Sequence, residues 1–238
     1  MRAILEESQK TWYSPQVWFG PSPWDSGVEL GVNGSSGTSD SFSVHSGAFI
    51  KRESRFSMID FDTNYNFTKG NGKASQNNAS VDLTNDWLID EKSPWTLFAK
   101  TNLFYDKFAT FDLQTNANLG VGYRFVHSPV LELMGRVGTG AEREFGGDQN
   151  DWVPESLVGF EYSQRVTKTQ KFCAKIEYFP EWHQVGEYRA VGDVGWEIEL
   201  VQPSNLSLKL SASDRYDSTP EGVSPHLMNY SVLLLLKL

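Results

Sequence analysis

Four histidines are the residues of this 238-residue chain with the most obvious potential for metal chemistry or catalysis. His45, His127, His183 and His226 lie in separate segments. None has a second histidine at the H-x-H or H-E-x-x-H spacing that places two zinc ligands on one face of a strand or helix. The sequence therefore predicts no metal site and no cofactor.

A catalytic nucleophile is equally hard to identify. The G-x-S-x-G turn that holds the serine of many hydrolases is absent, and serine is too frequent for one position to stand out. The single cysteine, Cys173, is expected to be a small buried or lumen side chain rather than a reactive thiol. We predict no catalytic residue and a protein that is not an enzyme.

Charged side chains remain, and they follow a regular pattern. Between residues 59 and 67, large apolar side chains alternate with Asp60, Asp62 and two asparagines. The same alternation surrounds Arg124 and Lys209. Because successive side chains of a β-strand point to opposite faces, this period of two predicts strands with one apolar and one polar face.

Turn-forming residues divide the chain after Gly27 into pieces of strand length. Clusters of Gly, Pro, Asn, Asp and Ser supply turn geometry. Eleven such clusters separate twelve expected strands, and they lie near residues 37–40, 52–55, 69–73, 90–94, 106–111, 127–129, 146–151, 167–171, 180–186, 202–204 and 217–225. We therefore predict an all-β fold, an antiparallel up-and-down barrel of about twelve strands. It forms a single domain over residues 27–238, after an irregular lead-in rich in aromatics and proline at residues 1–26.

The expected turns also alternate in length. The odd-numbered turns grow from four to nine residues, whereas the turns between them have three to five. Transmembrane barrels have an even number of strands, short periplasmic turns and longer outer loops. If the N-terminus starts on the periplasmic side, the odd-numbered turns lie outside, which agrees with the expected order.

Composition and the start of the chain narrow the class of protein. A net charge of -9 without a block of Lys or Arg argues against a nucleic-acid partner. The longest unbroken apolar run, Val232 to Leu236, is far below the roughly 20 residues of a transmembrane helix. The opening MRAILEESQK lacks the apolar stretch of a secretory signal, so we expect an export signal that was removed or lies upstream.

The alternation fits either a soluble barrel that holds an apolar ligand or a membrane barrel with lipid outside. Twelve strands enclose a lumen that apolar side chains do not easily fill, whereas charges of both signs suit a wet interior. Trp87, Trp95, Trp152 and Trp182 lie at or next to turns, where the aromatic girdles of membrane barrels occur. We therefore favour a bacterial outer-membrane barrel with the lipid bilayer as partner and small solutes or ions as possible cargo.

The period of two assigns seventeen charged side chains to the lumen, where they could line a pore. They have no predicted catalytic, cofactor or metal role, and acids outnumber bases by ten to seven. Opposite charges in so narrow a space should pair, so we expect a partly plugged bore. These residues are Glu29, Lys51, Asp60, Asp62, Lys100, Arg124, Glu132, Arg136, Glu142, Glu161, Lys175, Glu177, Asp193, Glu197, Glu199, Lys209 and Arg215.

Three segments resemble the family of salt-induced outer-membrane proteins, also catalogued as domain-of-unknown-function family 481. They are WDSGVELGVNGSSGTSDSFSV at 24–44, LGVGYRFV at 119–126 and RYDSTPEGV at 215–223, and the resemblance extends over roughly residues 24–238. Thr38 stands where the family usually has Asn. The resemblance implies an outer-membrane barrel without an established activity.

The expected role is therefore structural, or the passive passage of small solutes or ions. A soluble or periplasmic barrel that binds an apolar ligand is the alternative, and an outer-membrane hydrolase is a third. The sequence does not identify a solute or an oligomeric state.

Overall fold

The computed structural model describes residues 24–36, 40–54, 56–89, 93–147, 150–184, 186–200, 205–220 and 224–238. The expected N-terminal lead-in lies outside the described residues except for Trp24 to Ser26. Those three residues already belong to the first strand, so this strand begins slightly earlier than residue 27.

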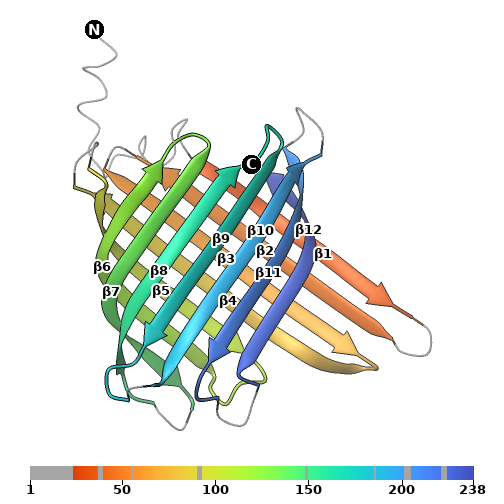
Figure 1. Cartoon of the computed structure of the whole chain (residues 1–238). Coiled ribbons are helices and arrows are strands. Elements are labelled where there is room, and N and C mark those ends of the chain that lie inside the picture. The colour runs from red at the N-terminus through yellow and green to blue at the C-terminus, as the bar shows by residue number, and fades with distance from the viewer. Residues whose placement is uncertain are drawn as a thin grey trace, which may run out of the picture.

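Twelve β-strands make up the described fold (Figure 1). They are β1 (Trp24–Ser35), β2 (Ser41–Glu53), β3 (Ser57–Gly70), β4 (Lys73–Leu88), β5 (Trp95–Asp106), β6 (Leu113–His127), β7 (Leu131–Phe145), β8 (Val153–Arg165), β9 (Gln170–Pro180), β10 (Tyr188–Glu199), β11 (Leu206–Asp217) and β12 (His226–Lys237).

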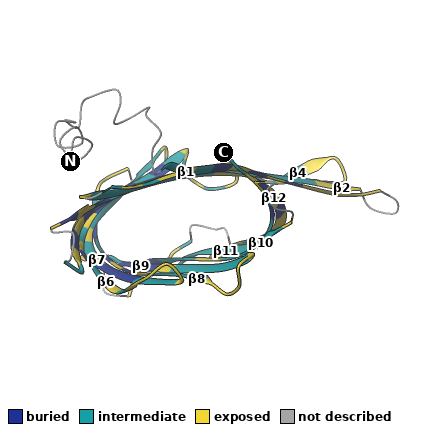
Figure 2. Cartoon of the chain, turned by 90° about the horizontal axis from the view of Figure 1, so that it is seen from above, coloured by how far each residue is buried: buried dark blue, intermediate teal, exposed yellow. Residues whose placement is uncertain are grey.

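Each strand pairs antiparallel with the next strand along the chain, and β12 pairs with β1 to close the barrel. The predicted all-β, twelve-strand, up-and-down barrel is therefore confirmed. Seen from above, the barrel is oval rather than round (Figure 2). We call the rim at which β1 begins the proximal rim, and the rim at which β1 ends the distal rim.

The strand pair that closes the barrel, β1 with β12, has few paired residues. β1 pairs with β12 only from Gly27 opposite Lys237 to Leu30 opposite Leu234, whereas β1 pairs with β2 along its full length. Toward the distal rim the first hairpins extend away from β12 (Figures 1 and 2).

The turn lengths differ from the expected alternation. β3 and β4 stay paired up to Gly70 and Lys73, so the turn expected at 69–73 contains only Asn71 and Gly72. Both have positive φ, 48° and 81°, as the tightest hairpin turns require. On the proximal rim, 89–94 and 200–205 are as long as 107–112 on the distal rim. The predicted steady alternation was wrong because strand pairing, rather than turn-forming composition, decides where a strand ends.

The outer face of the barrel is apolar, and its side chains are exposed. On β6, Leu119, Val121 and Phe125 are exposed by 64%, 45% and 54%, and large apolar residues are exposed on strands around the whole barrel. A monomeric soluble protein rarely leaves so much apolar surface uncovered. Within the described part of the chain, no helix is long and apolar enough to cross a membrane.

Aromatic side chains gather at both rims. Near the proximal rim, the ring centroids of Trp95 and Tyr123 lie 4.7 Å apart. Near the distal rim, Tyr178, Tyr188 and Tyr216 form a row with centroid separations of 5.1 and 5.4 Å. Two such girdles around an apolar band are typical of barrels that span a bilayer.

The four tryptophans named from the sequence divide between these rims. Trp87 and Trp95 lie at the proximal rim, while Trp152 and Trp182 lie beside the distal ends of β8 and β9. Closure, the apolar outer face and the girdles identify a transmembrane β-barrel of the outer-membrane type.

The outer face generates a stability prediction. Leu119→Arg places a charge in the middle of β6 and should destabilise the barrel by about 2 to 4 kcal/mol, because an arginine at the bilayer midplane loses its hydration. Leu113→Arg lies on the same face at the distal end of the strand and should cost about 0 to 1 kcal/mol. Urea-dependent unfolding from lipid vesicles measures both. Equal costs, or a tolerated Leu119→Arg, would show that this face does not contact lipid.

Candidate functional site in the bore and vestibule

Contacts between strands that are not neighbours show which face of the sheet lines the bore. Lys100 on β5 contacts Glu177 on β9, and Arg136 on β7 contacts Asp86 on β4. Such pairs can form only through the barrel interior. The register places all seventeen charged residues named from the sequence on this same face.

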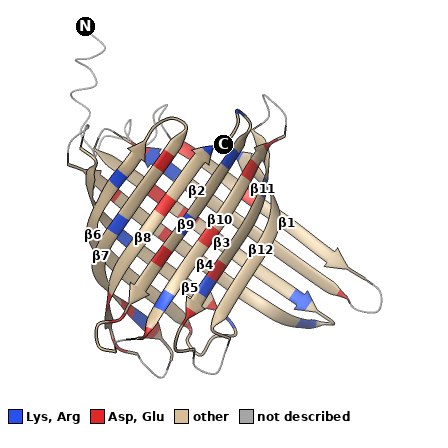
Figure 3. Cartoon of the chain, in the orientation of Figure 1, with Lys and Arg blue, Asp and Glu red and all other residues tan. Residues whose placement is uncertain are grey.

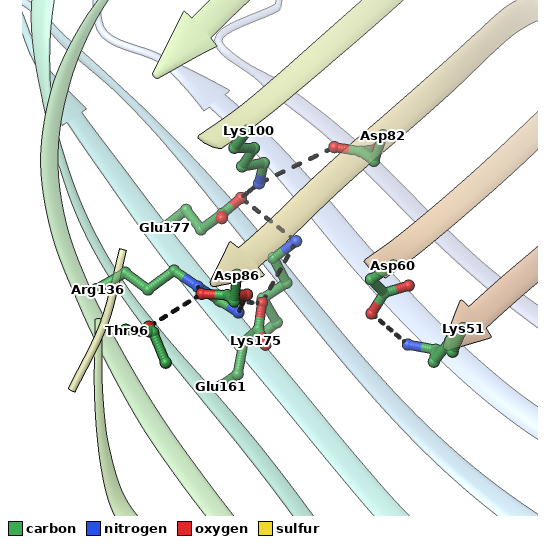
Figure 4. Close-up of polar contacts among 10 residues, drawn as sticks. All are labelled: Lys51, Asp60, Asp82, Asp86, Thr96, Lys100, Arg136, Glu161, Lys175 and Glu177. Carbon is green, nitrogen blue, oxygen red and sulfur yellow. Dashed lines mark hydrogen bonds and ion pairs between the residues drawn. The ribbon is translucent and has the colours of Figure 1, made fainter. Parts of the chain in front are cut away.

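The centre of the bore contains a first group of linked charges around Lys100 (Figure 4). Lys100 is 4% exposed, contacts Glu177 directly and lies 3.9 Å from Asp82. The Nζ of Lys175 lies 3.6 Å from Glu177 and 3.9 Å from Glu161. Two lysines therefore share one buried carboxylate between β5 and β9.

A second group surrounds Arg136, whose guanidinium lies between two carboxylates. Its Nη2 donates to Asp86 at 2.7 Å, its Nε donates to the same carboxylate at 3.1 Å, and its Nη1 lies 2.6 Å from Glu161. Thr96 also donates to Asp86 at 3.3 Å. The two-pronged contact with Asp86 fixes the guanidinium plane, as arginine and carboxylate geometry favours.

Closer to the distal rim, Arg189 on β10 holds a third group. Its Nη2 contacts Glu142 on β7 and lies 2.5 Å from Glu155 on β8. Glu155 is 1% exposed and also accepts from Asn118 at 2.9 Å. These contacts link the strands β6, β7, β8 and β10 on the inner face.

Apolar side chains also enter the bore, which the sequence interpretation did not anticipate. Phe98, Leu157 and Phe179 form a buried cluster from β5, β8 and β9. Phe98 lies over glycines of the two strands beside it, β6 and β7, because a Cβ at Gly120 or Gly138 would come within 2.9 or 2.8 Å of its ring. The interior that was expected to be uniformly polar is partly filled with hydrocarbon at this level.

The other predicted lining residues form separate pairs or lie beside members of these groups. Lys209 donates to Glu29 at 2.6 Å, Lys51 donates to Asp60 at 2.7 Å, and Glu197 pairs with Lys237 at 2.5 Å. In the register, Asp62 lies opposite Asp82, Asp193 opposite Lys175 and Glu199 opposite Ser207. Glu132 lies 3.7 Å from His127, and Arg124 lies 3.9 Å from Glu53. Figure 3 shows that acidic and basic residues occur on strands around the barrel.

Four important members of the charged groups were missed from the sequence: Asp82, Asp86, Glu155 and Arg189. The alternation of inward and outward side chains places all four on the inner face, so the sequence pattern could have identified them. Asp82 and Asp86 alternate with Val81, Leu83 and Trp87, and Arg189 has the same parity as Asp193 on β10.

A cavity of about 430 Å³ opens at the distal rim, and we call it the vestibule. Its lining combines Arg189, Arg215 and Gln114 on the strands with Phe104 and side chains of the distal loops. Among the residues that the structure describes, no group of three or more His, Cys, Asp or Glu side chains is arranged to hold a metal ion.

The charged groups generate a second stability prediction. Arg136→Ala should destabilise the barrel by about 3 to 5 kcal/mol, because it leaves the buried Asp86 carboxylate without its cation. Arg124→Ala is the matched control, since its partner Glu53 has a side chain that is 58% exposed and can be hydrated. Urea unfolding in lipid vesicles compares the two, and an Arg124→Ala cost equal to that of Arg136→Ala would contradict this ranking.

Comparisons with known proteins give one family and several distant structural likenesses. A family model described as a protein of unknown function, DUF481, matches residues 28–236. Among solved structures, a NanC porin has 8% identity and a TM-score of 0.49, over 89% of this chain and 97% of that chain.

Two autotransporter domains are also similar to this chain. The translocator domain of the autotransporter NalP from Neisseria meningitidis has 13% identity and a TM-score of 0.44, over 99% of this chain and 95% of that chain. The β-domain of the Bordetella autotransporter BrkA has 12% identity and a TM-score of 0.38, over 90% and 97% of the respective chains. No curated protein sequence matches. The family model covers most of the chain, and the protein belongs to the DUF481 family.

Proposed function

We propose that this barrel gives small polar solutes or ions a restricted passage across the bacterial outer membrane. One observation carries the proposal: charges of both signs line a continuous inner face, but they are joined across the bore rather than held apart. Lys100 with Glu177 and Arg189 with Glu142 are examples of such pairs. A purely structural barrel has no need of so many ionisable groups in its interior, where each costs desolvation energy.

The same contacts argue for a narrow passage rather than a wide one. Phe98, Leu157 and Phe179 exclude water from part of the bore, and the neighbouring ion pairs hold the walls close. A solute must displace these side chains or move past them. We therefore expect slow or intermittent conduction in place of the steady flow through a wide porin.

The surplus of carboxylates suggests the charge of the preferred ion. The missed residues add three acids and one base to the seventeen predicted lining residues. Rings of carboxylate favour cations in pores. We infer a weak cation preference.

The alternative of a soluble barrel around an apolar ligand requires the reverse arrangement of faces. Here the polar residues face inward and the apolar residues face outward, so this alternative has no support in the register. The expectation that the protein is not an enzyme stays a prediction.

Planar-bilayer recording tests the proposed function. The unmodified protein should show little steady current, whereas Phe98→Ala combined with Leu157→Ala should raise conductance several-fold by removing the apolar side chains from the bore. Leu119→Ala on the outer face is the matched control and should leave conductance unchanged. The shift between boiled and unboiled samples in gel electrophoresis verifies that each variant is folded. Steady porin-sized currents from the unmodified protein, or an anion preference, would overturn the proposal.

A further inference from the structure

The vestibule differs from the rest of the bore in how its charges are arranged. Elsewhere each buried arginine has a carboxylate partner, as Arg136 has Asp86. Arg215, on the inner face of β11, contacts the amide oxygen of Gln114 and lies with its guanidinium carbon 4.2 Å from the centre of the Phe104 ring. Among the described residues, no carboxylate oxygen lies within 4.0 Å of its side-chain nitrogen atoms. Its positive charge lines the cavity without a direct counter-ion.

A second guanidinium lies beside it. The register places Arg189 opposite Asp217 and Arg215 opposite Val191, so the two arginines are diagonal neighbours on β10 and β11. Arg189 is 4% exposed and also lines the cavity, and its Nη1 is buried without a hydrogen-bond partner. A buried donor of this kind is costly unless something accepts from it. The vestibule wall therefore presents two guanidinium groups. Arg189 is already held by Glu142 and Glu155, whereas Arg215 is the group that suits a ligand carboxylate.

The rim of the vestibule has the opposite charge. Carboxylates of the distal strand ends and loops line it, among them Asp106, Asp151, Glu181, Glu187 and Asp217. Deeper in the cavity, Glu142 and Glu144 accept from Gln114. The backbone N–H of Glu181 donates to the carbonyl of Glu187 at 3.1 Å, which brings two of these acids together. Burial and the neighbouring Glu187 raise the pKa of Glu181, as expected where acids are crowded. A cation entering the vestibule would relieve this repulsion.

We propose that the vestibule binds a small zwitterion, such as an amino acid or a short peptide. Its carboxylate lies on Arg215, beside Arg189, and its ammonium group lies among the rim carboxylates. Arginine binds carboxylates through two parallel hydrogen bonds, and stacking on Phe104 keeps the guanidinium plane fixed. A simple anion would meet the acidic rim, and a simple cation would meet the basic wall. This inference rests on the proposed passage function only in taking the ligand to be a solute that enters the bore.

Three probes of similar length separate these possibilities: 4-aminobutanoate, butanoate and butylamine. Saturation-transfer NMR measures their affinity for the full chain refolded in lipid nanodiscs. We expect 4-aminobutanoate to bind about tenfold or more tightly than either single-charge analogue, since only it satisfies both wall and rim. Arg215→Gln should weaken binding of 4-aminobutanoate about tenfold without weakening butylamine. Glu181→Gln combined with Glu187→Gln should weaken both.

Arg165→Gln, which removes a guanidinium from the proximal rim, is the matched control and should change none of these affinities. Equal binding of butylamine and 4-aminobutanoate, with no effect of Arg215→Gln, would overturn the proposal in favour of an acidic rim that attracts any cation. Absence of binding by all three probes in a folded sample would also overturn it. Because binding is measured without current, a barrel that conducts but does not bind refutes this inference alone, and one that binds but does not conduct refutes only the passage function.

Discussion

Backbone hydrogen bonding in lipid is the constraint on which the rest of this structure depends. No water is present in the bilayer core to satisfy an exposed N–H or C=O, so a spanning sheet must close on itself. Closure explains why β12 returns to β1 and why side chains alternate so strictly between faces. One face must be apolar for the lipid, and most charged residues of the strands are then directed into the bore.

The side chains that fill the bore are subject to a second constraint. A charged side chain removed from water is stable only beside an opposite charge or a good hydrogen-bond partner. Lys100 and Arg136 satisfy this requirement across the bore rather than along one strand. The same pairs connect strands that are not neighbours, and Phe98 packs with Leu157 in the same interior of the oval barrel. Charge pairing and apolar packing thus act together on the width of the passage.

The period of two was sufficient to predict the strand number, the up-and-down order and the face of the seventeen charged residues assigned from it, because these follow from local geometry. It did not predict which residues meet. Glu142 and Arg189 lie far apart in the sequence, and their contact joins two strands that are not hydrogen-bonded to each other. The turn at Asn71–Gly72 was misjudged because pairing of β3 with β4 extends through residues whose composition resembles a loop. The charge separation in the vestibule likewise depends on loops whose positions no periodicity encodes.

Solvent accessibility along one strand tests the central claim that lipid lies outside and charges lie inside. Nitroxide labels at each position from Ala117 to Tyr123, attached to single cysteines in a Cys173→Ser background, report contact with oxygen in lipid and with a water-soluble nickel complex. Collisions with oxygen should be highest at Ala117, Leu119, Val121 and Tyr123, and lower at Asn118, Gly120 and Gly122, because the first set faces outward. Higher oxygen collision rates at Asn118, Gly120 and Gly122 than at the other four positions, or equal rates at every position, would contradict a bilayer-spanning barrel with a polar interior.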